Sequence, residues 1–123
     1  DSTLVPCHGD FSPRNVLVSP GRSALIDWDR FQLADPARDI AHFGAWCWAE
    51  RVRRGEKPSW SVLDRAVTAY DALRPSARIR ERLGFHVAAA LVRASESLIL
   101  HSPEDALVVP ALAAEALRRL EAA

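Results

Sequence analysis

The segment that decides the fold runs from His8 to Asn15 and reads His-Gly-Asp-Phe-Ser-Pro-Arg-Asn. Within it, Asp10 is followed at the fifth position by Asn15, and a further carboxylate, Asp27, comes after the apolar pair Leu25-Ile26. Each of these polar residues lies beside a short apolar run that is typical of a strand. This set suits phosphoryl transfer, because one carboxylate can orient or deprotonate an acceptor hydroxyl while the other groups hold Mg²⁺ on nucleotide phosphates.

A β-hairpin is predicted directly after this segment. Asn15–Val18 and Ala24–Trp28 read as strands, and Ser19-Pro20-Gly21-Arg22 between them has the composition of a turn. The turn lies at the far end of the hairpin, so Asn15 and Asp27 meet at its open end. We therefore expect the side chains of Asp10, Asn15 and Asp27 to converge around one cation.

The order His-x-Asp-x-x-x-x-Asn is that of the kinase catalytic loop, with Gly9 where protein kinases carry Arg. Together with Leu25-Ile26-Asp27-Trp28 and Asp35-Pro36-Ala37-Arg38-Asp39-Ile40-Ala41, this loop resembles the aminoglycoside phosphotransferase / choline kinase family. The motifs occur in the right order and spacing within about the first 43 residues. The resemblance implies a protein-kinase-like fold, and residues 44–123 fit the variable helical region of that family.

The resemblance also implies the chemistry of the site. Asp10 is the expected catalytic base, Asn15 and Asp27 are the expected Mg²⁺ ligands, and ATP or GTP is the expected phosphoryl donor. Many relatives carry His two positions after the catalytic Asp, where this chain has Ser12. Ser12 could donate to a phosphate oxygen and Arg14 could neutralise developing charge, and both also suit a surface loop.

The roles of the nearby polar residues can be interpreted in more than one way. Asp29 either shares the metal or caps a turn. His8 is expected to support the loop by hydrogen bonds to backbone, and Asp39 either stabilises a helix dipole or holds the N–H groups of the loop. The remaining histidines have no metal-ligand spacing and read as helix-surface or core residues: His42, His86 and His101.

The sequence predicts about four helices after the hairpin. The first begins with Asp35 as N-cap and Pro36 as first residue and runs towards Arg54. The others are expected from Ser59 or Ser61 to Leu73, from Pro75 to about His101, and over 104–121 with a break or restart at Pro110. Trp46 and Trp48 read as core residues of the first helix. The fold class is therefore α+β and predominantly helical, as in the C-terminal lobe of a protein-kinase-like fold.

Composition limits the organisation and the partners. The 123 residues suffice for one domain, in which 1–35 form the catalytic loop and hairpin and 36–123 a helical subdomain. The chain begins at Asp1, contains no Met and no Gly-rich phosphate loop, and its single Lys, Lys57, lies in a polar linker. These features predict a C-terminal lobe without its N-terminal nucleotide-binding lobe. Zero net charge gives no indication of a nucleic-acid partner. No apolar run has the roughly 18 residues of a membrane span. The two cysteines favour a reducing cytoplasm.

Our interpretation of the sequence is a fragment of a small-molecule kinase. Such an enzyme would be a Mg²⁺-dependent phosphotransferase acting on the hydroxyl of an aminoglycoside-like or other small polar acceptor. We expect the fragment to be inactive alone, because the missing lobe would hold the phosphates. Two alternatives stay open: a non-catalytic lobe that binds a metal or a partner, and, more weakly, a metal-dependent phosphohydrolase using Asp10, Asp27 and Asp29.

Overall fold

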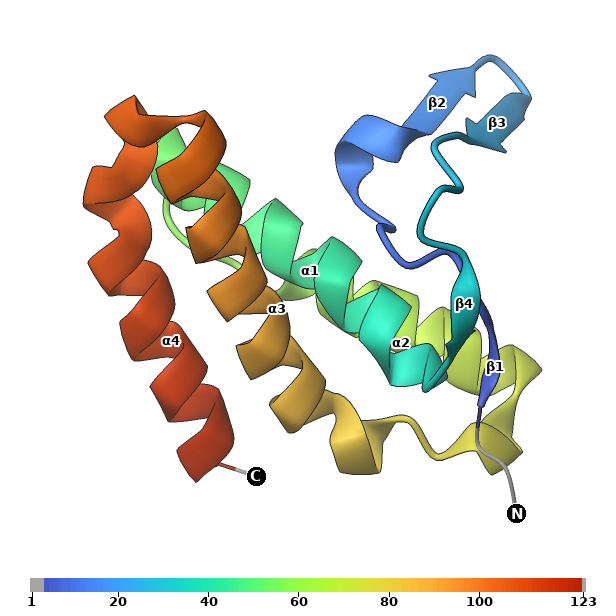
Figure 1. Cartoon of the computed structure of the whole chain (residues 1–123). Coiled ribbons are helices and arrows are strands. Elements are labelled where there is room, and N and C mark those ends of the chain that lie inside the picture. The colour runs from blue at the N-terminus through green and yellow to red at the C-terminus, as the bar shows by residue number, and fades with distance from the viewer. Residues whose placement is uncertain (1–3, 123) are drawn as a thin grey trace.

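The computed structural model describes residues 4–122 and shows a small β portion beside a larger helical portion (Figure 1). Its α-helices are α1 (Pro36–Arg53), α2 (Ser61–Leu73), α3 (Arg80–His101) and α4 (Val109–Glu121). Its strands are β1 (Val5–Cys7), β2 (Val16–Ser19), β3 (Arg22–Leu25) and β4 (Gln32–Ala34), and 3₁₀ turns cover Pro13–Asn15, Pro75–Ala77 and Pro103–Val108. The architecture is α+β and mainly helical, which confirms the predicted fold class.

The predicted hairpin is present as β2 and β3. The strands pair antiparallel with Val16 opposite Leu25 and Ser19 opposite Arg22, so the turn is made of two residues. Three details differ from the prediction. Ser19 and Arg22, which were predicted in the turn, are paired residues of the two strands. Asn15 lies in the preceding 3₁₀ turn, where Pro13 favours a tight helical start. β3 ends at Leu25, so Asp27 lies beyond the strand with a positive φ of 62°.

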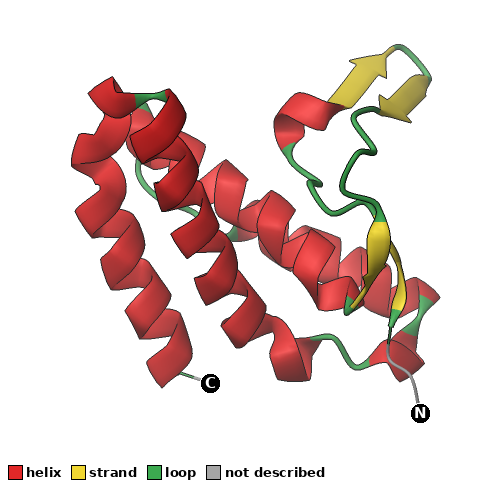
Figure 2. Cartoon of the chain, viewed as in Figure 1, coloured by secondary structure: helices red, strands yellow, loops and turns green. Residues whose placement is uncertain are grey.

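A second pair of strands, β1 and β4, was not predicted as a sheet. They pair antiparallel with Val5 opposite Ala34 and Cys7 opposite Gln32. Figure 2 shows the two strand pairs as separate pieces, with the loops that follow β1 and precede β4 between them. The β1–β4 pair therefore brings both ends of the loop-and-hairpin segment back to the start of α1.

Helix α1 begins as the sequence predicts. Asp35 accepts a hydrogen bond from the backbone N–H of Ala37 at 2.9 Å, and Pro36 occupies the first turn, where its missing N–H costs nothing. The Asp35 carboxylate also forms an ion pair with Arg82 and lies 3.3 Å from His86 Nε2, and both of these residues are on α3. The N-cap thus fixes the start of α1 and ties it to a second helix.

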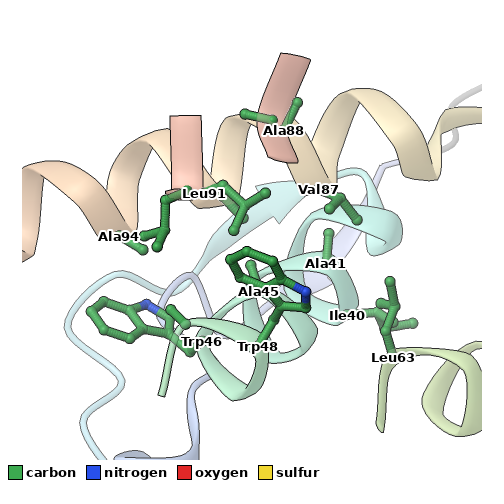
Figure 3. Close-up of a cluster of buried hydrophobic side chains, with 14 of the residues drawn as sticks. Ile40, Ala41, Ala45, Trp46, Trp48, Leu63, Val87, Ala88, Leu91 and Ala94 are labelled. Atoms are coloured by element: carbon green, nitrogen blue, oxygen red, sulfur yellow. The ribbon is translucent and has the colours of Figure 1, made fainter. Parts of the chain in front are cut away.

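The hydrophobic core lies where α1 packs against α2 and α3 (Figure 3). Trp46 and Trp48 of α1 are buried, which confirms their prediction as core residues. Leu91 and Ala94 of α3 lie in the same cluster, and α4 packs on another side of α3. Helix α3 is apolar and long enough to cross a membrane by length and composition alone, a test that core helices also pass. Here its buried residues belong to this core.

Two helix starts were predicted too early. The predicted third helix has a 3₁₀ turn at its start, and Arg78 with a positive φ of 50° separates this turn from α3. Before α4, a 3₁₀ segment covers Pro103–Val108, and Pro110 lies in the first turn of the helix. Pro110 therefore marks a restart, one of the two outcomes that the sequence allowed.

Candidate active site

The loop between β1 and the hairpin is held by side chains beneath it. The backbone N–H groups of His8 and Gly9 donate to the Asp39 carboxylate at 2.7 and 3.1 Å. His8 Nδ1 accepts from the backbone N–H of Asp10, so its Nε2 carries the proton and donates to the Ile26 carbonyl at 2.8 Å. These contacts confirm the supporting roles expected of His8 and Asp39, and they join the loop to both α1 and the end of the hairpin.

Gly9 is required by the backbone of this loop. Its φ is +90°, a conformation that residues with a side chain rarely adopt. A Cβ at this position would also collide with the backbone carbonyl of Arg30. The loop before β4 therefore packs directly on the backbone of this loop, which explains why a Gly stands between His8 and Asp10.

The carboxylate of Asp10 receives donors on both of its oxygens. His42 Nε2, on α1, donates to Oδ1 at 3.0 Å. Asn15 Nδ2 donates to Oδ2 at 3.2 Å and to the Asp10 backbone carbonyl at 2.9 Å. The Arg14 guanidinium lies 3.5 Å from Oδ2. The side chain of Asp10 is thus fixed in one orientation by groups from two elements.

These contacts also set the protonation states of Asp10 and His42. Burial alone would raise the pKa of Asp10, but the hydrogen bonds from His42 and Asn15 and the charge of Arg14 outweigh it and leave the pKa lowered. Burial lowers the pKa of His42, and the charges of Arg93 and Arg38 act in the same direction against the attraction of Asp10. At neutral pH the pair is therefore a carboxylate with a neutral imidazole donating to it.

His42 is the residue of this site that the sequence reading missed. It was placed among core or surface histidines, and it is indeed buried. Its partner Asp10 lies 32 residues away in the chain, so no local spacing connects them. The available signal was its position one turn after Asp39 on the same helix face, since Asp39 was already expected to face the loop.

The structure brings the side chain of Asn15 next to Asp10. The side chain of Asp27 contacts neither residue, and only the backbone of its neighbour Ile26 bonds to Asn15. Ile26 N–H donates to the Asn15 carbonyl at 3.0 Å, which places Asp27 one residue beyond the open end of the hairpin. Within residues 4–122 the Asp27 carboxylate has no hydrogen-bond or ion-pair partner, and the residue is exposed. Convergence of all three side chains therefore stays a prediction.

The donor set fits Mg²⁺. Asn15 Nδ2 donates to Asp10, and in the described part of the chain no donor bonds to Asn15 Oδ1. This amide oxygen and the free Asp27 carboxylate are the hard oxygen ligands that Mg²⁺ prefers. Across residues 4–122 no group of three His, Cys, Asp or Glu side chains could hold a metal ion. A metal here would therefore depend on Asn15, Asp27 and oxygen atoms from a bound nucleotide.

The two residues predicted to contact phosphate have different surroundings. Ser12 is buried, and its hydroxyl donates to the Asp10 carbonyl at 3.5 Å. The side chain of Arg14 is exposed and lies 5.8 Å from the Trp46 ring centroid, measured from the guanidinium carbon. The exposed guanidinium of Arg14 is thus accessible to a ligand, and phosphate binding by Ser12 or Arg14 stays a prediction.

Comparison with known proteins agrees with this arrangement. Residues 1–79 match the model of the phosphotransferase enzyme family. Protein LicA of Haemophilus influenzae is 46% identical over 41 residues, which are 33% of this chain and 12% of that protein. Protein LicA of Haemophilus influenzae strain Rd is 47% identical over 38 residues, 31% of this chain and 14% of that protein. No solved structure matches.

Because the family model covers more than half of the chain, the chain belongs to the phosphotransferase enzyme family, the aminoglycoside phosphotransferase / choline kinase family that the sequence resembles. The helical architecture after a catalytic-loop hairpin is accordingly that of the C-terminal lobe of a protein-kinase-like fold. The matched segments span about an eighth of the length of the two LicA proteins.

Proposed function

We propose that this chain is the catalytic-loop lobe of a small-molecule kinase that transfers the γ-phosphate of ATP or GTP to a hydroxyl group. The observation that carries the proposal is the Asp10 carboxylate, held ionised by His42, Asn15 and Arg14. A carboxylate has about four lone-pair positions, so Asp10 can still accept a hydrogen bond from an acceptor hydroxyl. An ionised, fixed carboxylate in the family's catalytic-loop motif is suited to general-base catalysis.

The reaction follows from these positions. The acceptor hydroxyl donates to Asp10, which orients its oxygen and takes its proton. As the bond between that oxygen and the γ-phosphorus forms, the bond from the γ-phosphorus to the bridging oxygen breaks, and the nucleoside diphosphate leaves. Asn15 and Asp27 would hold Mg²⁺, which when bound offsets the negative charge of the nucleotide phosphates.

We further propose that an N-terminal nucleotide-binding lobe of the same protein completes the site. The hairpin and β4 expose large apolar side chains of the kind that a neighbouring domain covers: Leu17, Val18, Leu25 and Leu33. Without that lobe the phosphates lack half of their positioning groups, so the chain alone should turn over little substrate. A cytoplasmic location is part of this proposal, in keeping with the free thiols of Cys7 and Cys47.

Replacement of Asp10 tests the proposal. In the full natural protein, Asp10→Asn should lower kcat by about 10²–10⁴-fold, because the amide cannot take the proton. Formation of nucleoside diphosphate is measured at saturating ATP and Mg²⁺ with aminoglycoside-like and other small polar acceptors that carry a hydroxyl group. Asp64→Asn is the matched control, since Asp64 is exposed on α2 and its side chain forms no ion pair or hydrogen bond with residues 4–122.

The outcomes separate the alternatives. Normal turnover in Asp10→Asn, with the fold intact by circular dichroism, would remove Asp10 as the base. Binding of Mg²⁺ or of a protein partner without any turnover by the full natural protein would favour the non-catalytic lobe. Release of inorganic phosphate in the absence of an acceptor would favour the phosphohydrolase.

A further inference from the structure

A cleft of about 280 Å³ opens beside Asp10, and four arginines line it. They come from separate parts of the chain: the catalytic loop, the loop before β4, helix α1 and helix α3, which carry Arg14, Arg30, Arg38 and Arg93 respectively. His42 and Trp46 of α1 lie in the same wall. The fold therefore gathers positive charge at the place where the proposed base meets its substrate.

The carboxylates in the cleft do not balance these arginines. Only two line it, Asp10 and Glu96. Asp10 already accepts from His42 and Asn15, and Glu96 forms no ion pair with any of residues 4–122. Of the four guanidinium groups, only that of Arg14 is within 4 Å of a carboxylate, at 3.5 Å. Among the residues that line the cleft, four arginines thus stand against two carboxylates.

Arg93 has the least favourable surroundings of the four. Its Nε and Nη2 atoms are buried and have no hydrogen-bond partner in the described residues. Burial lowers the pKa of Arg93, and the charge of Arg38 lowers it further. Arg93 is half-buried, and its two buried nitrogens have lost water contacts without gaining a hydrogen bond, which is unfavourable. An anion in the cleft would offset that cost by its charge.

The position of the cleft indicates which substrate brings the anion. Its lining includes Asp10 and His42, but neither Asn15 nor Asp27. The Oδ1 atom of Asp10 bonds to His42 in the cleft wall. Its Oδ2 atom bonds to Asn15 of the proposed metal pair and lies 3.5 Å from Arg14, which also lines the cleft. A hydroxyl substrate and the nucleotide phosphates must approach the base from different directions for in-line transfer. The cleft is accordingly on the acceptor side.

We propose that the acceptor carries an anionic group, a carboxylate or a phosphate, which Arg93 and Arg38 hold in this cleft while the acceptor hydroxyl reaches Asp10. This inference rests on the proposed kinase function and narrows its substrate class. The cleft volume suits a small molecule, and its arginines disfavour polycationic acceptors such as aminoglycosides. Arginine is the side chain best suited to paired hydrogen bonds with carboxylate or phosphate.

Direct binding is the first test. The full natural protein, labelled with ¹⁵N, is titrated without nucleotide with inorganic phosphate, D-glycerate or choline, and the Nε–Hε signals of arginine are followed. Phosphate and glycerate should shift the Arg93 and Arg38 signals, and choline should not. Arg65, exposed on α2 with no ion pair to residues 4–122, is the internal control. Equal shifts with choline, or no shift with either anion, would overturn the inference.

Kinetics provide the second test. With an acceptor that combines a hydroxyl and an anion, Arg93→Gln should raise the acceptor KM by about 10–100-fold, the worth of one charged hydrogen bond. The KM for ATP should stay unchanged, Arg93→Lys should retain part of the affinity, and Arg65→Gln should behave as wild type. A raised KM for ATP instead would assign the cleft to the nucleotide and overturn the inference.

The two proposals can fail separately. Turnover with choline or kanamycin, unaffected by Arg93→Gln, would leave the kinase function standing and remove the anionic acceptor. Anion-induced shifts of Arg93 without phosphoryl transfer to any acceptor would remove the kinase function and keep the anion site. Thermal melts show whether a loss of binding in Arg93→Gln is caused by loss of the fold. Arg30 is an exposed residue of the same cleft, and Arg30→Gln is the second variant.

Discussion

The contact between Asp10 and His42 joins the proposed base to the helical core. His42 lies on α1, whose other faces pack against α2 and α3, so its ring has little freedom to move. Because His42 is neutral at neutral pH, its Nε2–H orients Asp10 without adding a full positive charge beside it. Asp10 therefore keeps its ionised state from several moderate contacts, and removal of one should weaken the site without abolishing it.

The lowered pKa of His42 predicts a pH dependence of stability. The unfolded chain takes up a proton at His42 near its ordinary pKa of about 6.5, while the folded protein takes it up only at lower pH. The unfolded state binds more protons in that window, so the free energy of unfolding should fall as pH decreases below about 6.5. The slope from this residue is at most about 1.4 kcal/mol per pH unit.

The variant His42→Gln checks this dependence, because Gln keeps an N–H donor but does not titrate. Urea unfolding between pH 7 and pH 5 should give a flatter curve for His42→Gln than for the wild type. His101→Gln is the control, since His101 is exposed and has no hydrogen-bond partner among residues 4–122. Identical slopes for wild type and His42→Gln would contradict the assignment.

At the scale of elements, the glycine in α1 sets how closely two helices approach. A Cβ on Gly44 would lie 2.7 Å from both Cβ and Cδ1 of Leu63 on α2. Gly44→Ala should therefore lower the free energy of unfolding by about 1–3 kcal/mol through overpacking, although Ala favours a helix by about 1 kcal/mol. Denaturant unfolding measures this change.

A double-mutant cycle isolates the cause. In a Leu63→Ala background, Gly44→Ala should cost less, because the Cγ and Cδ1 contacts are gone. An unchanged cost in that background would show that helix–helix contact does not explain the effect.

Elements with strong local signals could be predicted from the sequence, and short ones could not. Asp35-Pro36 marks the start of α1, and Pro20-Gly21 marks the hairpin turn. The three-residue strand β4 has no pattern of its own and exists because β1 pairs with it. The candidate site divides in the same way: the spacing of Asp10 and Asn15 is local, whereas His42 and Arg93 reach the site only through the packing of α1 and α3.

At the scale of the whole molecule, the site spans two parts that differ in burial. Helices α1 and α3 share the buried core, while the strands of the β2–β3 hairpin are mainly exposed and extend away from the helices (Figure 1). An isolated two-stranded hairpin is marginally stable in water. The element that presents Asp27 should therefore open far more often than the helices that present His42 and Arg93.

Hydrogen exchange tests this difference and links it to function. Amides of 16–25 should exchange much faster than those of α1 in the full natural protein without ligand. Addition of Mg²⁺ and ATP should slow exchange in the hairpin, because a ligand held by Asn15 and Asp27 at its open end stabilises the closed form. Asp27→Asn should remove that slowing, with the unchanged exchange of α3 as the internal control. Hairpin amides already protected without nucleotide, or equally protected in Asp27→Asn, would mean that metal binding at this end does not order the hairpin.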